Sequence, residues 1–432
     1  MIIFINTILS LALPLIPEYT LIILKCQFVL YLCMIVVDIY KTKQFNLMHT
    51  WIAAFLFIIW SDMILTAAED FNQVYTIPIF FYLIANCLVL WGYKLSRGTK
   101  SSDTSIHNII HPRYFLFFII VGVLIFIVFY YSKVQTTLTY GRILNDAKGS
   151  TTLTGSIVSA LGLILPACIA YYFKYISKGG WVYSILLSMP IFILQALIAT
   201  RFKLLFQIIP FLIVTGFLKV KNNTSKSLII MAIAMLIIGA YSSYTKEYRN
   251  YAANESIIKE QIYASDTQDD IFLTIAQEMS PEGIIRMAYL ANDYFEDNNL
   301  SYGRESLTIF YFWIPRAWWP DKPTQLDYWL IREYETTSDA HSTSSGFLGE
   351  LRADFGWFSL FFAIIIGIAL KKCDTYIQRI FMLNRHPIQI VFASMLYPYF
   401  FFFVRSPLTA SINLIFCYII YIIIKKTMCK PI

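Results

Sequence analysis

The sequence is poor in charged residues. Asp, Glu, Lys and Arg make up 14% of its 432 residues, whereas hydrophobic residues make up 58%. Soluble globular proteins carry about 25% charged residues, so this composition excludes an ordinary soluble fold. The apolar residues gather in stretches close to the roughly 20 residues of helix that cross a bilayer core. We therefore expect an integral membrane protein.

Several motifs of common enzymes are missing. The chain has no Walker lysine loop, no G-x-G-x-x-G fingerprint, no H-E-x-x-H pair, and no Asp-x-Asp pair of the kind that holds a metal-bound nucleotide sugar. These absences argue against ATP hydrolysis and against transfer from a nucleotide sugar. A donor that is already carried in the membrane fits better, and no cofactor is expected.

Cysteine is missing from the longest polar segment. None of the 7 cysteines lies between residues 244 and 354. A disulfide scaffold and a thiolate-ligated metal site are therefore both disfavoured in this segment.

The apolar segments predict the fold class. Only helices satisfy their own backbone groups at such apolar stretches, so we expect an all-α polytopic membrane protein with about 12 transmembrane helices. The first segment lacks the basic start and the small-residue cleavage site of a signal peptide, and is interpreted as a helix. The expected spans lie near residues 2–16, 20–38, 48–67, 75–93, 113–131, 155–174, 181–200, 203–219, 227–243, 355–370, 387–404 and 407–424.

Most of the basic residues outside the long polar segment occur in short loops that fall on one side of these spans. The positive-inside rule assigns that side to the cytoplasm, so both termini are expected there. The acidic loops, including Glu69 and Asp70, then lie outside. Because the net charge of +7 is spread over cytoplasmic loops, nucleic acid is not an expected partner. The basic loop residues include Lys41, Lys43, Lys94, Arg97, Arg113, Lys174, Lys178, Lys221, Lys226, Lys371, Lys372, Arg379, Arg385, Lys425 and Lys426.

A long polar insert divides the helices into two groups. We assign 1–243 to an N-terminal bundle of about nine helices, 244–354 to one large extracytoplasmic loop, and 355–432 to about three C-terminal helices with a short cytoplasmic tail. The insert contains 19 acidic and 9 basic residues. An anion site in it must therefore be built from particular arginines.

The insert is expected to be largely helical at first. Pro281 marks a helix start, after which Ile284, Ile285 and Ala288 form an apolar stripe while Asp293 faces water. The later run LTIFYFWIPRAWWP is rich in aromatic residues, which favour the level of the lipid headgroups. That run is therefore expected to lie on the membrane surface.

Two arginines stand at the outer junctions of helices. Arg201 lies in ALIATRFKLLF and Arg405 lies in FFFVRSPLTA. A charge at this depth is costly unless it is paired or serves a ligand, and a guanidinium group binds phosphate in a bidentate manner. We interpret the two residues as a phosphate clamp. The alternative is a pair of interfacial arginines that snorkel to water.

The candidate catalytic bases are His341 and Glu350. His341 is the only one of the five histidines expected outside, and imidazole suits general-base catalysis, although a lone polar loop residue can equally be inert. Glu350 and Arg352 come just before the helix near Phe355, where both are expected to meet lipid headgroups. Glu350 is either the base or a helix-terminal charge, and Arg352 is a candidate for substrate binding.

A second group of candidates surrounds the tryptophan-rich run. Arg316 and Lys322 bracket Trp319, either as an aromatic membrane anchor or as a surface that holds sugar rings and an anionic lipid head. Arg249, near the start of the insert, is a further candidate for substrate binding. Asp62, in WSDMIL, is interpreted as a buried polar contact rather than a proton relay.

These residues resemble a known family, the Wzy-type oligosaccharide repeat-unit polymerases of O-antigen and capsule synthesis. The similar pattern comprises about a dozen spans, one large late outer loop, and the run IPRAWWPDKP followed by STSSGFLGELRADFG. It also includes TRFKLL between two helices, and Arg405 near the outer end of a late helix. The motifs cover a small part of the sequence, and topology covers the rest.

The resemblance implies an inverting, metal-independent glycosyl transfer at the outer face of the bacterial cytoplasmic membrane. The donor and the acceptor would both be oligosaccharides linked to undecaprenyl diphosphate. A fold like that of the lipid-dependent glycosyltransferases is implied, and a chain-length regulator and a flippase become candidate protein partners. Under this reading, arginines hold the diphosphate and His341 or Glu350 activates the acceptor hydroxyl.

Three other functional hypotheses are compatible with the sequence. The related O-antigen ligases share the late loop and its arginine and histidine chemistry but use a lipid A core acceptor; the proline-rich run P-R-x-W-W-P-x-K-P favours the polymerase. A flippase or other transporter is expected to carry charges in mid-helix and short loops, unlike this chain. A structural membrane protein is the third reading.

Overall fold

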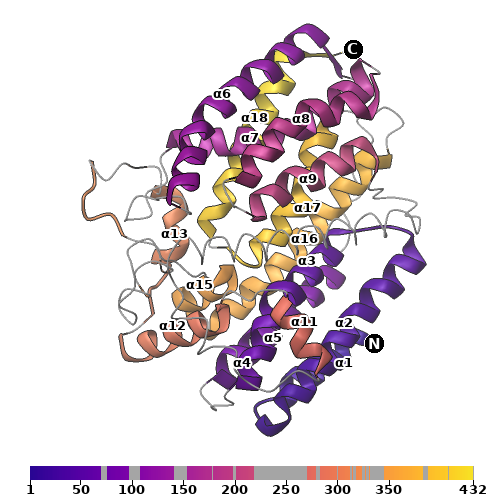
Figure 1. The fold of residues 1–432 in the computed structure, drawn as a ribbon. Coiled ribbons are helices and arrows are strands. Elements are labelled where there is room, and N and C mark those ends of the chain that lie inside the picture. The colour runs from indigo at the N-terminus through magenta and orange to yellow at the C-terminus, as the bar shows by residue number, and fades with distance from the viewer. Residues whose placement is uncertain are drawn as a thin grey trace.

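The structure is a computed structural model of the chain. It describes residues 1–69, 75–96, 108–140, 153–177, 179–197, 201–217, 270–278, 283–298, 300–311, 314, 318–323, 326, 330, 345–382, 388–406 and 408–431. Most of these residues are helical (Figure 1).

The elements in the first half of the chain are α1 (Ile2–Ala12), the 3₁₀ turn η1 (Pro17–Tyr19), α2 (Thr20–Thr42), α3 (Leu47–Ala54), the π-helical η2 (Phe55–Trp60), α4 (Ser61–Glu69), α5 (Thr76–Leu95), β1 (Asn108–Ile110), α6 (Pro112–Tyr140), α7 (Leu153–Tyr171), the π-helical η4 (Tyr172–Ile176), α8 (Gly180–Leu197) and α9 (Arg201–Thr215). The second half contains α11 (Ile271–Glu278), α12 (Ile284–Asn298), α13 (Arg304–Tyr311), α15 (Gly346–Phe355), the 3₁₀ turn η5 (Gly356–Phe358), α16 (Ser359–Met382), α17 (Gln389–Phe403), the 3₁₀ turn η6 (Leu408–Ser411), α18 (Ile412–Met428) and β2 (Cys429–Pro431).

The helices are those of a membrane-embedded protein. Within the described ranges, 7 segments are long and apolar enough to cross a bilayer, as expected for an all-α membrane fold. Three shorter apolar helices, Ile2–Ala12, Leu204–Thr215 and Gln389–Phe403, also fall on expected spans. The expected span at 227–243 lies outside the described residues. The 7 long segments are Pro17–Thr42, Leu47–Ala68, Thr76–Leu95, Pro112–Tyr131, Gly155–Ile176, Gly180–Leu197 and Gly346–Phe381.

Two glycines allow α5 and α16 to cross at close range. A Cβ atom added at Gly92 would lie 2.3 Å from the carbonyl oxygen of Ile364, and one at Gly367 would lie 2.0 Å from that of Val89. No side chain fits at either position, so the absence of one at each glycine allows the two backbones to approach each other here. This crossing sets α16 in place and, with it, the segment that precedes α16.

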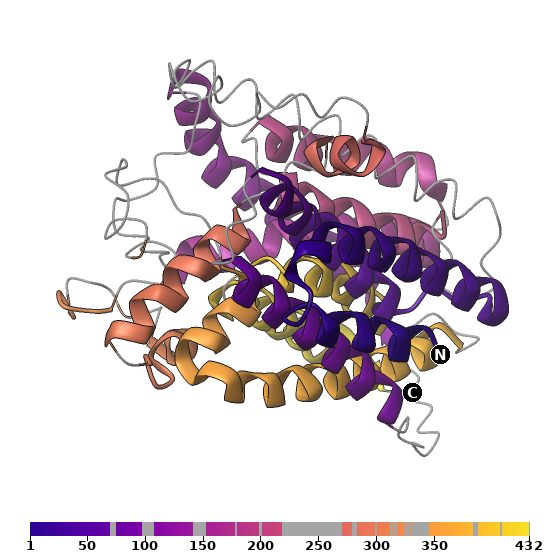
Figure 2. The same cartoon turned by 90° about the horizontal axis from the view of Figure 1, so that it is seen from below.

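Three helices of the insert lie together at one end of the bundle. α12, α13 and α15 are neighbours at the left of Figure 1 and again at the left of Figure 2. α11 lies against α4 and α2, where Phe272 meets Phe28 edge to face. Helical structure in the insert was expected from the sequence, and α11 to α15 confirm it for the described parts.

A buried carboxylate attaches α12 to the bundle. Asp62, on α4, is 6% exposed and accepts the backbone N–H groups of Gly283 (3.1 Å) and Ile285 (2.6 Å) at the first turn of α12. An anion is favourable there because the first amides of a helix have no partner within the helix. The interpretation of Asp62 as a buried polar contact is therefore confirmed.

The rest of α12 follows the predicted pattern. Ile284, Ile285 and Ala288 are buried, whereas Asp293 is exposed. The stripe packs against the bundle, so the amphipathic prediction for this segment is confirmed.

An ion pair attaches α11. Lys25 of α2 donates a hydrogen bond to Asp270, which precedes α11 and also accepts the N–H of Phe272. The hydrogen bond from Lys25 is the main reason why the pKa of Asp270 lies below its ordinary value. The ion pair therefore stabilises the fold at pH values above the pKa that Asp270 has in the unfolded chain. This contribution is lost as the pH falls through the lower pKa that Asp270 has in the folded chain.

At the opposite end of the bundle, segments that the charge pattern assigns to the cytoplasm contact one another. β1 and β2 form an antiparallel pair in which Asn108 faces Pro431 and Ile110 faces Cys429, a pairing that the sequence did not predict. Asp374 accepts the N–H of Leu47 (3.2 Å) and the hydroxyl of Tyr93 (2.6 Å).

Candidate functional site

The centre of the candidate site is α15, a short helix packed inside the protein. Every residue from Gly346 to Asp354 is buried, and α15 contacts α12, α13 and α16. Gly346 has a φ of 69°, and a Cβ atom there would lie 2.6 Å from the carbonyl oxygen of Val404. Glycine at this position therefore allows the start of α15 to meet the end of α17.

The burial of α15 corrects one expectation. Glu350 and Arg352 were expected to meet lipid headgroups, but they are only 2% and 8% exposed. The expectation was wrong because α15 is a separate helix that is covered by other parts of the chain. The helix that continues into the apolar span, α16, begins only after the 3₁₀ turn at Gly356.

Asp354, at the end of α15, organises the start of α13. One carboxylate oxygen accepts the hydroxyl of Ser301 (2.6 Å) and the N–H of Glu305 (3.0 Å), and the other accepts the N–H (2.8 Å) and hydroxyl of Ser306. The side chain is fully buried. Because it satisfies first-turn amides of α13, it joins two helices that are some 50 residues apart in sequence.

Glu350, also on α15, contacts the turn that follows α17. Its Oε2 accepts the backbone N–H of Leu408 at 2.7 Å, at the first residue of η6. Gly346, one turn earlier on α15, is close to the backbone carbonyl of Arg405. Glu350 therefore lies beside the turn that carries Arg405.

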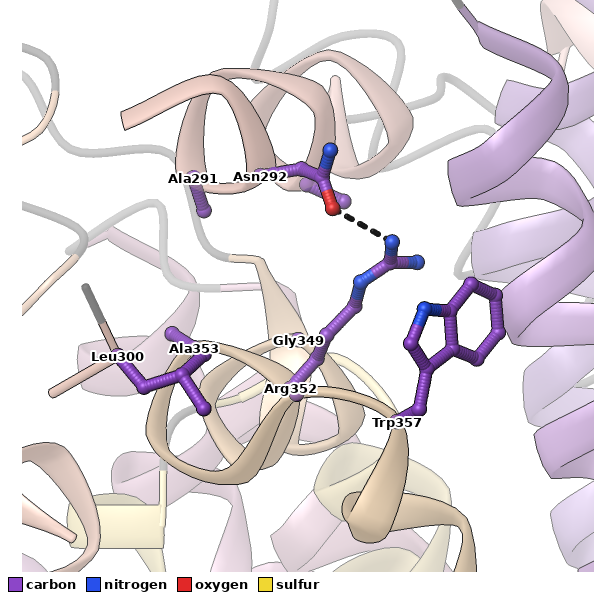
Figure 3. Close-up of a pocket in the computed structure, with 9 residues that line it drawn as sticks. Ala291, Asn292, Leu300, Gly349, Arg352, Ala353 and Trp357 are labelled. Carbon is purple, nitrogen blue, oxygen red and sulfur yellow. Dashed lines mark hydrogen bonds between the residues drawn. The ribbon is translucent and has the colours of Figure 1, made fainter. Parts of the chain in front are cut away.

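Arg352 is held in one orientation by three elements. Its guanidinium carbon lies 4.7 Å from the ring centroids of both Phe81 on α5 and Trp357 on η5. Its Nη2 donates a hydrogen bond of 2.6 Å to Oδ1 of Asn292 on α12 (Figure 3). Aromatic rings stabilise a desolvated guanidinium by about 2 kcal/mol. The residue is thus a fixed and largely buried cation.

A cavity of about 150 Å³ lies beside this cation. Figure 3 shows Arg352 between Asn292 and Trp357, with the small residues of α12 and α15 around them. Trp357 is 50% exposed, so the cavity is bordered by an indole that also reaches the surface. The lining residues are Ala288, Ala291, Asn292, Leu300, Gly349, Arg352, Ala353, Gly356 and Trp357.

Arg201 and Arg405 lie at the same end of two packed helices. Arg201 is the first residue of α9, and Arg405 follows α17 and is half-buried. Phe206 of α9 contacts Phe402 of α17, with 5.0 Å between ring centroids. Each arginine is within about two helical turns of that contact, so their backbones are brought to one region. The Arg405 guanidinium carbon lies 5.9 Å from the Phe402 ring centroid.

The remaining predicted site residues fall elsewhere. Lys322 is buried and donates to the carbonyl of Ile314 (2.9 Å), which closes the tryptophan-rich turn on itself. Trp319 packs against Tyr311 of α13, with 5.3 Å between ring centroids. His341, Arg316 and Arg249 lie outside the described residues.

Sequence reasoning missed three residues of the site. They are Asp354, which joins α15 to α13, and Asn292 and Trp357, which both contact Arg352. Trp357 carried a usable signal, because it is a tryptophan five residues after an arginine at the start of an apolar span. Nothing in the sequence joins Asn292 to Arg352.

In the part of the chain that the structure describes, no three His, Cys, Asp or Glu residues lie close enough together to hold a metal ion. No family model, curated protein or solved structure matches the chain.

Proposed function

We propose that this chain polymerises polyprenyl-diphosphate-linked oligosaccharide repeat units into a surface polysaccharide. The observation that carries the proposal is the fixed, buried Arg352 beside a cavity, next to a half-exposed tryptophan, in a membrane-embedded chain. A buried cation with an aromatic wall suits a substrate that has both an anionic group and a ring. The resemblance of IPRAWWPDKP and STSSGFLGELRADFG to repeat-unit polymerases supports the same assignment.

The proposed reaction is an inverting, metal-independent glycosyl transfer. A hydroxyl at the non-reducing end of the acceptor attacks the anomeric carbon of the donor, and a new C–O bond forms as the bond to the diphosphate breaks. The polyprenyl diphosphate leaves with the electron pair of that bond, while a base takes the proton of the hydroxyl.

Two groups of residues are assigned to these tasks. Arg201 and Arg405 stabilise the charge that develops on the leaving diphosphate, in keeping with the placement of both backbones in one region. His341 or Glu350 is assigned to the proton. Glu350 is supported by its position next to the Arg405 turn.

The function is tested by analysing the lipid-linked glycans of a strain that lacks the protein. We expect single repeat units on the lipid and no long polymer, and the native chain should restore the polymer. An Arg201→Ala, Arg405→Ala double variant should fail to restore it at normal protein level, because alanine removes the bidentate contacts to phosphate.

Arg304→Ala is the matched control, since Arg304 is half-exposed on α13 and its Nε lies 3.8 Å from a carboxylate oxygen of the neighbouring Glu305. Loss of all surface glycan in the deletion strain, rather than loss of polymer alone, would identify a flippase or a ligase. Near-normal polymer from the double variant would refute the diphosphate assignment.

The proposal places about 12 spans in the cytoplasmic membrane, with both termini inside and α12, α13 and α15 outside. The contacts of Asp62, Asp270 and Asp354 support this arrangement, because each joins segments that the charge pattern assigns to the outer side.

A labelling experiment tests the orientation. Tyr302 is 75% exposed just before α13, so a cysteine in its place should react with a membrane-impermeant maleimide in intact spheroplasts. Lys41→Cys, at an exposed position expected in the cytoplasm, should react only after permeabilisation. The native chain measures the labelling of the natural cysteines. Labelling of position 41 but not of position 302 would reverse the topology.

A further inference from the structure

The cavity beside Arg352 is matched in size to a single ring. Its volume is about 150 Å³, and a protein cavity of about that volume accommodates a six-membered ring such as benzene. The space exists because five of its lining residues are alanine or glycine, with Ala288 and Ala291 on one side and Gly349, Ala353 and Gly356 on the other. A lone phosphate group would fill only part of it.

The polar groups are concentrated on one side of the cavity. Arg352 and Asn292 are hydrogen-bonded to each other there, and Trp357 contributes an aromatic surface beside them (Figure 3). The rings of Phe81 and Trp357 have already removed much of the water around the guanidinium. An anionic group that enters the cavity therefore meets a cation that is desolvated and fixed, which strengthens their interaction.

We propose that this cavity binds one pyranose ring that carries a carboxylate, as in a uronic acid. The carboxylate is assigned to Arg352, and the ring to the space between the small residues of α12 and α15. A neutral sugar would not use the guanidinium charge, and inorganic phosphate would not use the indole. The ring substituents extend past Trp357, where the cavity borders the surface.

This proposal rests on the proposed function in one respect: the acidic sugar is taken to be part of the repeat unit that the chain would polymerise. Binding is measured on the purified full chain without any polymerisation step. A failure of binding removes the acidic-sugar site and the support that this cavity gives to the proposed function, whereas polymerisation is tested separately by the lipid-linked glycans of the deletion strain. A failure of polymerisation leaves the binding site untouched.

The test is calorimetric titration of the purified chain with methyl glucuronide, methyl glucoside and inorganic phosphate. We expect methyl glucuronide to bind about tenfold more tightly than methyl glucoside, because a hydrogen bond to a charged group contributes about 1 to 1.5 kcal/mol more than a neutral one. Arg352→Gln should lower the affinity for methyl glucuronide to that for methyl glucoside. Ala291→Leu should weaken both, because it fills the cavity and leaves the charge in place.

Two controls make the outcomes decisive. Arg304→Ala removes an arginine outside the cavity and should leave the affinity for methyl glucuronide unchanged. Thermal unfolding shows whether Arg352→Gln is folded, and Ala291→Leu provides the test if it is not. Equal affinity for the two sugars, binding that Ala291→Leu does not weaken, or tighter binding of phosphate than of methyl glucuronide would each overturn the proposal.

Discussion

Asp354→Ala is expected to lower the free energy of unfolding by about 3 kcal/mol and to detach α13 from α15. The substitution removes a fully buried carboxylate that accepts four hydrogen bonds, two of them from first-turn amides of α13. A hydrogen bond to a charged group contributes about 1.5 to 3 kcal/mol, and donors left buried without an acceptor add to the loss. The bonds share one side chain, so their contributions do not simply add.

Thermal unfolding in detergent measures the loss of stability, and limited proteolysis measures the release of α13. Asp321→Ala is the matched control, because Asp321 is an exposed acid of the same insert and its removal should leave both readouts unchanged. Asp354→Asn should fall between the two, since an amide oxygen keeps some of the hydrogen bonds. Equal melting temperatures for Asp354→Ala and Asp321→Ala would show that the carboxylate does not hold the helices together.

The helices could be predicted because their cause is local. A run of apolar residues predicts a membrane helix whatever the rest of the chain does. The described parts of the chain have helices at the expected spans. The apolar stripe of Ile284, Ile285 and Ala288 could also be predicted, because the helical period is a property of the segment itself. The π-helical segment at Phe55–Trp60 had no such local signal.

The candidate site could be predicted only in part, because its contacts join distant segments. The arginines at 201 and 405 were found from the cost of a charge near lipid, and their helices do pack together. The burial of α15 was missed because hydropathy averages over a window, and this helix carries Glu350, Arg352 and Asp354 within five residues. Their partners lie on α13, η6, α12 and α5, and no sequence pattern specifies those pairings.

The largest catalytic effect is expected from the loss of the base, which we assign first to His341 and second to Glu350. A general base contributes about a hundred- to ten-thousand-fold in rate, so His341→Ala should lower the rate with lipid-linked repeat units by that factor. Glu350→Gln should lower it only a few-fold if Glu350 is structural. A glutamine keeps a carbonyl oxygen that can accept the Leu408 N–H, the contact that now holds Glu350 at 2.7 Å.

The comparison separates three mechanisms in a reconstituted assay. If His341→Ala alone fails, the imidazole is the base, and the carboxylate orients the turn between Arg405 and Leu408. If Glu350→Gln alone fails, Glu350 is the base, and its burial at 2% exposure means that the acceptor must reach into the protein beside η6. If both variants keep most of the rate, the arginines supply the catalysis by stabilising the diphosphate. His111→Ala, which alters a histidine at the opposite end of the bundle beside β2, should leave the rate unchanged in every case.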